Sequence, residues 1–551
     1  MSVYDEKVWL ARYDEGQPAE ITPEYANAVD MFRATVARTP AGDAIRYFDG
    51  RISYAELDAL TDAFATGITA EGFAPGERVA IFAQNVPQFV IAQIGTWKAG
   101  GIAVSINPMN KQRELAELLA DSGATVLVAL QSLHRDVAAE VLPGTGVRLV
   151  LTTSELEYQS RDEPAVFAGV ERLETPGATD LAEFLARHRG GTPPTVDPGP
   201  EDIAFLTYTS GTTGPPKGAM TTHRNVVFNA QTYRDWIGID ADDVVLGVAP
   251  LFHITGLVGH VAIALLTGAP LVLMYRLDPA LTLDVAEAEG ATFTVGSITV
   301  FIALMNAANA DKAKLATLTK IYSGGAPIPP STVDAFRDTF GHYIHNIYGL
   351  TETTSPSHAV PFHAEAPVDP ESGALSVGVP TFDTIVRIVD EEGRDLPAGS
   401  VGEIVTEGPQ VVAGYWNKPE ETAKALPGRV LHTGDVGYMD ADGWFYIVDR
   451  KKDQINAGGY KIWPREVEDV LYEHPAVREA AVVGIPDEYR GETVKAFVSL
   501  KGGAQATPEE IIAFARERMA AYKYPRRVEI LDEIPKTVSG KVLRRELRTR
   551  T

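Results

Sequence analysis

The sequence predicts an α/β protein with at least two domains, and three observations support this fold class. The chain has 551 residues, which is more than a single hydrophobic core normally contains. Apolar residues make up 45% and charged residues 22%, which is an ordinary globular composition. In the first third, short apolar runs alternate with helical patterns of about a dozen residues, as in parallel sheets covered by helices.

This alternation is clearest between residues 78 and 130. We expect strands over 78–83, 101–106 and 124–130, separated by helices over 86–98 and 111–121. A Gly- and Pro-rich stretch at 190–200 predicts a surface loop. Beyond it the pattern resumes, and further strands are predicted at 203–207, 244–248, 271–274 and 320–323.

The last part of the chain has a different pattern. Short runs separated by Gly, Pro and Asn over 401–444 predict a small antiparallel, barrel-like unit. The charged run DRKKD at 449–453 directly follows an apolar strand, which is typical of a domain junction. Beyond the junction we expect helices at 464–473 and 508–521 and strands at 480–484 and 494–500. We therefore expect a large N-terminal domain of stacked mixed and parallel sheets at 1–450 and a small α+β C-terminal domain at 451–551.

Composition narrows the possible partners. The formal charge of -25 disfavours nucleic acid and anionic lipid as partners. There is no cysteine, which excludes disulfides, thiolate zinc sites and a cysteine nucleophile. The N-terminus lacks the apolar core of a signal peptide, and the most apolar stretch, 258–274, is interrupted by His, Thr, Gly and Pro. We expect a cytoplasmic protein with small-molecule substrates and no integral membrane segment, as a monomer or homodimer, with 258–274 forming a buried helix and strand.

The segment TYTSGTTGPPKG at 207–218 has the composition of a phosphate-binding loop. Glycines let backbone amides turn toward an anion, hydroxyls add donors, and Lys217 adds positive charge. The spacing is not that of a Walker A loop. A generic glycine-rich surface turn is the alternative, and the density of hydroxyl side chains argues against it.

Four later segments add chemistry for a nucleotide. SGGAP at 323–327 consists of small residues against which a flat ring can lie. In NIYGLTE at 346–352, Tyr348 can stack on a base, Asn346 can pair with an adenine edge, and Glu352 is a hard oxygen ligand suited to Mg²⁺. YWNK at 415–418 precedes HTGD at 432–435, where Asp435 follows a tight turn and suits ribose hydroxyls. Taken alone, YGLTE at 348–352 could also be an ordinary strand-to-turn segment.

The C-terminal segment PKTVSGK ends at Lys541. A lysine beside Ser-Gly on a mobile loop can bridge a carboxylate and an α-phosphate. In a basic tail such a lysine is otherwise a solvated surface residue. Its spacing after the upstream motifs favours the catalytic interpretation.

Together, in this order, these segments resemble the adenylate-forming superfamily, which includes acyl-CoA synthetases, peptide-synthetase adenylation domains and firefly-type luciferases. The resemblance extends from Tyr47 to Arg545. It implies that ATP activates a carboxylic acid as its adenylate and that coenzyme A then takes the acyl group, with Mg²⁺ as cofactor. The ATP and AMP contacts that it implies are Thr209, Ser210, Gly211, Thr212, Thr213, Gly214, Lys217, Gly325, Ala326, Pro327, Asn346, Tyr348, Gly349, Thr351, Asp435 and Arg450.

The resemblance also implies separate roles in the two half-reactions. Lys541, Glu352 and Thr351 would be catalytic, and Glu352 and Thr209 would contact the metal. The C-terminal domain would be mobile and rotate about Lys452, which would exchange the Lys541 loop for a loop along the pantetheine tunnel. The tunnel residues would be Gly458, Gly459 and Tyr460.

The segment PLFHITGL at 250–257 separates the branches of the superfamily. It has no aspartate of the kind that amino-acid adenylating domains use for an ammonium group, and no carrier-protein serine motif follows. The pair Phe252 and His253 resembles the acyl pocket of acyl- and aryl-CoA synthetases, to which we add Leu257 and Phe301. His253 could also be a hydrogen-bonded core histidine.

The junction and the glycine loop look most like those of bacterial medium- or long-chain fatty acid–CoA ligases. The alternatives are an aryl- or coumarate-type CoA ligase and an acyl-adenylating enzyme that loads a carrier protein. A non-enzymatic scaffold is disfavoured because Lys217, Glu352 and Lys541 are all present.

Overall fold

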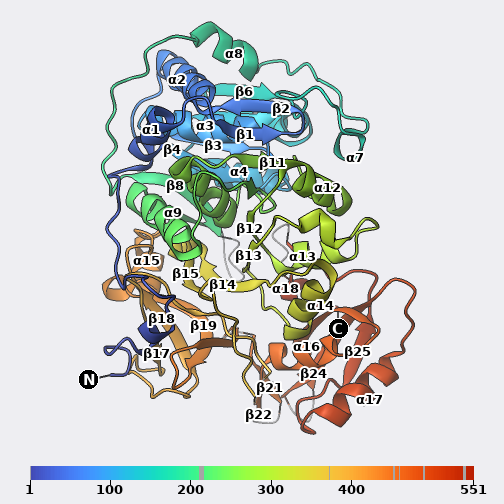
Figure 1. Cartoon of the computed structure of the whole chain (residues 1–551). Coiled ribbons are helices and arrows are strands. Elements are labelled where there is room, and N and C mark those ends of the chain that lie inside the picture. The colour runs from blue at the N-terminus through green and yellow to red at the C-terminus, as the bar shows by residue number, and fades with distance from the viewer. Residues whose placement is uncertain are drawn as a thin grey trace.

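The computed structural model describes residues 2–209, 216–370, 373–450, 453–457, 460–487, 491–537 and 542–550. Its strands form sheets of seven, nine, four and five strands. Figure 1 shows the first two stacked in the upper and middle parts of the molecule, with the four- and five-stranded sheets below them on opposite sides. This architecture confirms the predicted α/β class with stacked sheets.

The seven-stranded sheet has the order β7-β6-β5-β3-β4-β8-β9 and is parallel except for the β8–β9 hairpin. Every residue of its central strands β4 and β5 is buried, as expected where helices cover both faces. The strands predicted between 78 and 130 are confirmed. The bounds are β3 Arg78–Phe82, β4 Ile102–Ile106, β5 Val126–Leu130, β6 Leu149–Thr153, β7 Thr179–Asp180, β8 Ile203–Thr209 and β9 Lys217–Thr222.

The nine-stranded sheet has the order β16-β15-β14-β13-β12-β10-β11-β1-β2. Its middle is parallel, while the β1–β2 and β14–β15–β16 edges are antiparallel. The bounds are β1 Asp43–Tyr47, β2 Gly50–Ser53, β10 Val245–Leu246, β11 Leu271–Leu273, β12 Phe293–Gly296, β13 Lys320–Ser323, β14 His345–Leu350, β15 Ser355–Ala359 and β16 Val379–Pro380.

The helices of this part pack on the two sheets and on one another. Helix α3 is buried along its whole length, because it contacts strands β3 and β4 as well as helices α1 and α2. The main helices are α1 Ala28–Arg38, α2 Tyr54–Ala70, α3 Pro87–Lys98, α4 Gln112–Ser122, α8 Leu181–His188, α9 His223–Ile237, α12 Pro279–Glu289, α13 Ile298–Met305 and α14 Pro330–Phe340. Short helical pieces are η1 Val8–Arg12, α5 Gln131–Leu133, η2 His134–Ala138, α6 Ala139–Val141, η3 Leu142–Gly144, α7 Pro164–Phe167, η5 Lys312–Leu315 and η6 Thr351–Thr353.

The most apolar stretch is a buried helix followed by a strand, as predicted. It starts as α10 (Ile254–Gly256), continues through a π-helical stretch η4 (Leu257–Ala262) and ends as α11 (Ile263–Thr267). Gly268, at φ 88°, ends the helix before strand β11. In the part of the chain described above, no helix combines the length and apolar character needed to cross a membrane.

The four-stranded sheet has the order β17-β18-β19-β20 and is antiparallel throughout. The sheet begins before the unit predicted at 401–444, because its first strand, β17, starts at Ile385. The bounds are β17 Ile385–Val389, β18 Gly402–Glu407, α15 Pro419–Ala425, η7 Pro427–Arg429, β19 Leu431–Met439 and β20 Phe445–Arg450.

The C-terminal unit is the predicted mixture of strands and helices. Its five-stranded sheet has the order β22-β21-β24-β23, and β25 pairs with β24 in parallel. The bounds are β21 Ile455–Ala457, β22 Tyr460–Ile462, α16 Pro464–Tyr472, β23 Val477–Asp487, β24 Gly491–Leu500, α17 Pro508–Arg518, β25 Arg527–Ile530 and α18 Arg544–Arg548.

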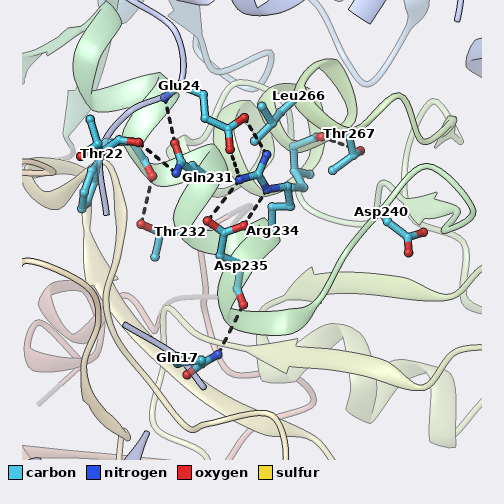
Figure 2. Close-up of polar contacts among 12 residues, drawn as sticks. Gln17, Thr22, Glu24, Gln231, Thr232, Arg234, Asp235, Asp240, Leu266 and Thr267 are labelled. Carbon is cyan, nitrogen blue, oxygen red and sulfur yellow. Dashed lines mark hydrogen bonds and ion pairs between the residues drawn. The ribbon is translucent and has the colours of Figure 1, made fainter. Parts of the chain in front are cut away.

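The N-terminal segment connects distant parts of the fold. Tyr13 Oη donates to Pro380 O at 2.8 Å, at the edge of the nine-stranded sheet. Farther along, Glu24 pairs with Arg234 of α9, and Glu24 N donates to Gln231 Oε1 at 3.1 Å. Figure 2 shows the contacts of Glu24 with α9, and Gln17 donating to Asp235 O of the same helix. The segment therefore fixes the outer face of α9, whose other residues reach the candidate site.

Candidate active site

The predicted phosphate loop lies between two paired strands. Thr209 ends β8 and Lys217 begins β9, and the two residues pair directly across the hairpin. Thr209 Oγ1 donates to Lys217 O at 3.5 Å. The predicted contacts Ser210, Gly211, Thr212, Thr213 and Gly214 lie outside the described residues.

A second segment lies along the open edge of β9. Met220 N donates to Gly414 O at 2.9 Å, Ala413 N donates to Met220 O at 3.0 Å, and Trp416 N donates to Gly218 O at 2.8 Å. These bonds place Tyr415 opposite Ala219. The start of the YWNK motif is thereby brought beside Lys217, although about two hundred residues separate them in the sequence.

We call the group Lys217, Glu352, Tyr415 and Glu421 the phosphate-side cluster. Tyr415 Oη donates to Glu352 Oε1 at 2.6 Å. Lys217 Nζ lies 5.0 Å from the centre of the Tyr415 ring and 2.6 Å from Glu421 Oε2. The cluster thus combines a lysine, an aromatic ring and the predicted Mg²⁺-binding carboxylate.

The pKa shifts in the cluster favour a neutral Tyr415 and an ionised Glu421. Burial of Tyr415, together with the nearby Glu352 carboxylate, raises the pKa of the phenol far above its usual range. Tyr415 therefore remains a neutral donor to Glu352. The Lys217 ammonium lowers the pKa of Glu421, because it favours the ionised carboxylate.

Glu352 sits on a strained turn. It belongs to η6, and the two residues after this short helix, Thr354 and Ser355, have φ values of 51° and 88°. Asn229 Nδ2 of α9 donates to the carbonyls of Thr353 and Thr354, and Tyr233 Oη lies 2.9 Å from Ser355 Oγ. Helix α9 therefore holds the turn that presents Glu352.

Gly349, just before this turn, has no room for a side chain. A Cβ atom there would lie 1.6 Å from Ser355 O, so only glycine fits. Thr351 is the first residue of η6, and its O accepts from Thr354 N at 3.1 Å. The phosphate contact of Thr351 stays a prediction.

Two of the predicted nucleoside contacts meet directly. Tyr348 Oη donates to Asp435 Oδ2 at 2.8 Å. Asp435 is buried and follows Gly434, whose φ is 69°. The tight turn expected from HTGD is instead an irregular point within strand β19, where the register with β18 shifts. Asp435 also pairs with Arg450 in the β19–β20 register. The structure therefore brings three of the expected base and ribose residues to one place.

The Asn346 side chain, expected to pair with adenine, makes a hydrogen bond within the protein. Its side chain is buried, and Nδ2 donates to Ser376 O at 2.9 Å. One donor of the amide is therefore engaged within the protein, and an adenine contact would use the rest of the group. This contact stays a prediction.

The SGGAP segment follows β13 with the close approach that its small residues allow. A Cβ atom at Gly324 would lie 2.4 Å from Ile347 O, and Gly325 has a φ of 79°. Ala326 and Pro327 continue this turn. The segment lies beside β14, the strand that carries Asn346 and Tyr348.

Three of the four predicted acyl residues lie at the start of the apolar helix. Phe252 and Leu257 are buried, whereas His253 is only partly buried and accepts from Thr255 N at 3.3 Å as the cap of α10. Phe301 of α13 is fully buried and packs edge-to-face on Phe336. The pocket assignment of these four residues stays a prediction.

The remaining predicted residues belong to the C-terminal unit or its junction. Lys452, Gly458, Gly459 and Lys541 lie outside the described residues. Tyr460 begins β22 and pairs with Ala457, and Arg450 ends β20. The ribose contact of Arg450 and the pantetheine contacts of Gly458, Gly459 and Tyr460 stay predictions.

Sequence reasoning missed the roles of Tyr415 and Glu421. The YWNK motif marked the region but gave no reason to connect its tyrosine with Glu352, 63 residues away. The supporting residues Asn229 and Tyr233 of α9 were also not predicted, since they resemble ordinary polar residues of a packed helix. No pattern in the sequence marked them.

A lysine at the start of β9, a carboxylate just after β14 and a tyrosine-bound aspartate in β19 are typical of an α/β enzyme that binds a nucleotide. The sequence matches the AMP-binding enzyme family over residues 32–416 and the AMP-binding enzyme C-terminal domain over residues 466–541. The chain belongs to this family, as the superfamily resemblance predicted.

Similar proteins include ligases for two kinds of acid. A long-chain-fatty-acid–CoA ligase of Bacillus subtilis (strain 168) is 37% identical, over 98% of each chain. A feruloyl-CoA synthase of an Amycolatopsis species is 36% identical, over 93% of this chain and 96% of its own. A crystal structure of an anthranilate CoA ligase in complex with anthranoyl-AMP matches with a TM-score of 0.86 and 26% identity, over 97% of this chain and 99% of that one.

Proposed function

We propose that this protein is an ATP-dependent ligase that adenylates a medium- or long-chain fatty acid and transfers the acyl group to CoA. AMP and pyrophosphate are the other products. The observation that carries the proposal is the phosphate-side cluster, in which Lys217 and Glu352 meet at Tyr415 beside the predicted phosphate loop. The same proposal places the reaction in the cytoplasm, in a monomer or homodimer.

In the first half-reaction, the carboxylate of the acid attacks the α-phosphorus of ATP and pyrophosphate leaves. Such a step depends on positioning and on neutralising negative charge rather than on a protein nucleophile. Lys217 and the loop from Thr209 would bind the departing phosphates. Tyr348 and Asp435 would orient the base and ribose, and Lys541 would stabilise charge between the carboxylate and the α-phosphate.

The residues present fit Mg²⁺ as a partner of ATP. Glu352 and Thr209 supply hard oxygen atoms, and Mg²⁺ is usually bound by one or two carboxylates together with substrate phosphates. Among the described residues, no group of three His, Cys, Asp or Glu side chains is assembled for a metal, so the phosphates would complete such a site. Bound there, the ion would neutralise phosphate charge, while Tyr415 holds the orientation of Glu352.

In the second half-reaction, the thiol of CoA attacks the acyl carbon and AMP leaves. The superfamily resemblance supports a division into residues 1–450 and 451–551, with rotation about Lys452 between the two steps. Gly458, Gly459 and Tyr460 would then border the pantetheine, in place of the Lys541 loop. A domain motion of this kind can limit turnover.

The choice of a fatty acid rests on two observations. The long-chain-fatty-acid–CoA ligase relative matches the chain nearly end to end. The predicted acyl residues Phe252, Leu257 and Phe301 are apolar and buried, as an uncharged acyl tail requires. The feruloyl-CoA synthase relative, at almost the same identity, favours an aryl acid as the second candidate.

The test is carboxylate-dependent ATP–pyrophosphate exchange across fatty, aryl and amino acids, with CoA-dependent AMP release measured in parallel. We expect exchange and AMP release with fatty acids. Preference for aryl acids would support the second candidate. Exchange without CoA turnover would indicate an enzyme that loads a carrier protein, and no exchange with any acid would contradict adenylation altogether.

A further inference from the structure

A buried ion-pair network crosses the C-terminal unit. Asp453, the residue after the predicted hinge Lys452, has a side chain that is only 8% exposed. Arg548 Nη2 of α18 donates to Asp453 Oδ1 at 2.8 Å, and Arg544 Nη1 lies 3.8 Å from Asp453 Oδ2. The chain leaving the junction is therefore joined to the last helix.

Arg544 extends this network to a second helix and a strand. Its Nη2 donates to both carboxylate oxygens of Glu468 on α16, at 2.7 and 2.9 Å. Glu468 Oε1 also accepts from Val482 N of β23 at 2.7 Å, and Arg544 Nε donates to Val482 O at 3.3 Å. One pair of side chains, Glu468 of α16 and Arg544 of α18, thus also contacts strand β23 and Asp453 at the start of the unit.

The geometry favours a fixed arrangement of these segments. Glu468 and Arg544 are 9% and 19% exposed, so water competes weakly for their charges. Bonds between guanidinium and carboxylate groups are short and directional, and they define orientation as well as distance. Separating the two partners of a buried pair would leave an uncompensated buried charge, and this cost opposes relative movement of the segments that carry them.

The position of the network in the sequence gives it a consequence for chemistry. Arg544 lies three residues after Lys541, and Asp453 lies one residue after Lys452. The two ends of the network therefore lie within three residues, in the sequence, of the proposed catalytic lysine and of the proposed hinge. Lys541 must reach a defined place only in the first half-reaction.

We propose that Asp453, Glu468 and Arg544 are positioning residues for adenylation. They fix α18, which follows Lys541 in the sequence, relative to Asp453, which follows Lys452. This inference rests on the proposed function, because it assigns Lys541 to adenylation. It adds three residues to those of the predicted site.

The test separates the half-reactions in the full-length protein. Asp453→Asn and Arg544→Lys are compared with wild type for ATP–pyrophosphate exchange with hexadecanoate, and for thioester formation from supplied hexadecanoyl-adenylate and CoA. A displacement of about 1 Å can cost up to about a hundredfold in rate, so we expect exchange to fall about tenfold or more. Thioester formation should change by less than about twofold, since Lys541 takes no part in it.

The matched control is Asp243→Asn in the nine-stranded-sheet region. The Asp243 side chain is about as buried as that of Asp453, at 7% exposed, and it accepts from Lys320 Nζ at 2.7 Å and from Thr292 Oγ1 at 2.6 Å. If the network acts only through stability, Asp453→Asn, Arg544→Lys and Asp243→Asn all lower the rates of both half-reactions in proportion to their loss of folded protein. That result, or equal losses of exchange and thioester formation in Asp453→Asn and Arg544→Lys, would overturn the proposal.

Lys541→Ala distinguishes this inference from the proposed function. Selective loss of exchange in Lys541→Ala with normal exchange in Asp453→Asn and Arg544→Lys would refute the positioning role alone. Unchanged exchange in Lys541→Ala would refute the catalytic assignment on which the inference rests. The expected result is selective loss of ATP–pyrophosphate exchange in Lys541→Ala, Asp453→Asn and Arg544→Lys.

Discussion

The ion pairs at the phosphate-side cluster and in the C-terminal unit differ in their exposure to water. Lys217 and Glu421 are 28% and 46% exposed, whereas Arg544 and Glu468 are 19% and 9% exposed. Exposed pairs contribute about 0–1 kcal/mol, because water and salt compete with them. Buried pairs are costly to break once formed.

This difference suits the tasks proposed for the two regions. Lys217 must exchange its carboxylate partner for phosphate oxygens, so a weak partner is an advantage. The C-terminal unit must turn as one piece, so its internal pairs must persist. Four substitutions test this contrast, beginning with the largest expected effect.

Glu352→Gln should cause the largest loss. Replacing the carboxylate with an amide removes the negative charge of the proposed Mg²⁺ ligand and leaves a neutral, weaker acceptor for the Tyr415 bond. Loss of one charge-stabilising group at a reacting centre costs about 10²–10³ in rate, and we expect a loss of this size in ATP–pyrophosphate exchange. The exposed Glu391, replaced in the same way, is the control. Exchange within about threefold of wild type would remove Glu352 from the site.

Glu468→Gln should destabilise the C-terminal unit by about 3 kcal/mol, since it leaves Arg544 buried with one charged partner fewer. Hydrogen exchange of amides in α16, β23 and α18 measures this local stability. Glu529→Gln is the control in the same unit, because its pair with Lys495 is more exposed and its loss should cost less than about 1 kcal/mol. Equal protection in the two variants would contradict the contrast between buried and exposed pairs.

Tyr415→Phe should lower exchange about tenfold and raise the Mg²⁺ concentration that the enzyme needs. The substitution keeps the ring beneath Lys217 but removes the 2.6 Å bond to Glu352, and a bond to a charged group is worth about 1.5–3 kcal/mol. Tyr446→Phe, which removes a 3.2 Å bond to Asp440, is the matched control. If both variants behave alike, Tyr415 has only a packing role.

Glu421→Gln should have the smallest effect and the opposite sign. Without its carboxylate partner, Lys217 is available to ATP, so the KM for ATP should fall about two- to fivefold at low salt. The difference should shrink at high salt, because ions screen an exposed pair. Glu420→Gln is the neighbouring exposed control. A higher KM in Glu421→Gln would mean that Glu421 assists ATP binding rather than competing with it.

Much of the fold could be predicted because its elements have strong local patterns. The strands at 78–82, 102–106 and 126–130 are continuous apolar runs, and each is followed by a helix with caps or a change of periodicity. The strand predicted at 244–248 is only two residues long, as β10, and the early start of the four-stranded sheet at Ile385 was not predicted. Their pairing partners, rather than their own propensities, define them.

Within the candidate site, residue types were predictable and partners were not. The glycine, hydroxyl and lysine content of 207–218 indicated phosphate binding, and NIYGLTE indicated a carboxylate for Mg²⁺. Nothing in these segments indicated that Asn229 and Tyr233 hold the turn after Glu352. Support of this kind comes from a helix more than a hundred residues earlier in the chain.

Local periodicity and side-chain type were enough to predict the α/β class, the order of the elements and the chemistry available in each motif. Only the folded structure shows that Tyr415 binds Glu352, that Glu421 pairs with Lys217, and that Arg544 joins Glu468. These partners are 63, 204 and 76 residues apart. Their meeting depends on strand order and register, which are set by packing of the whole chain and leave no local pattern.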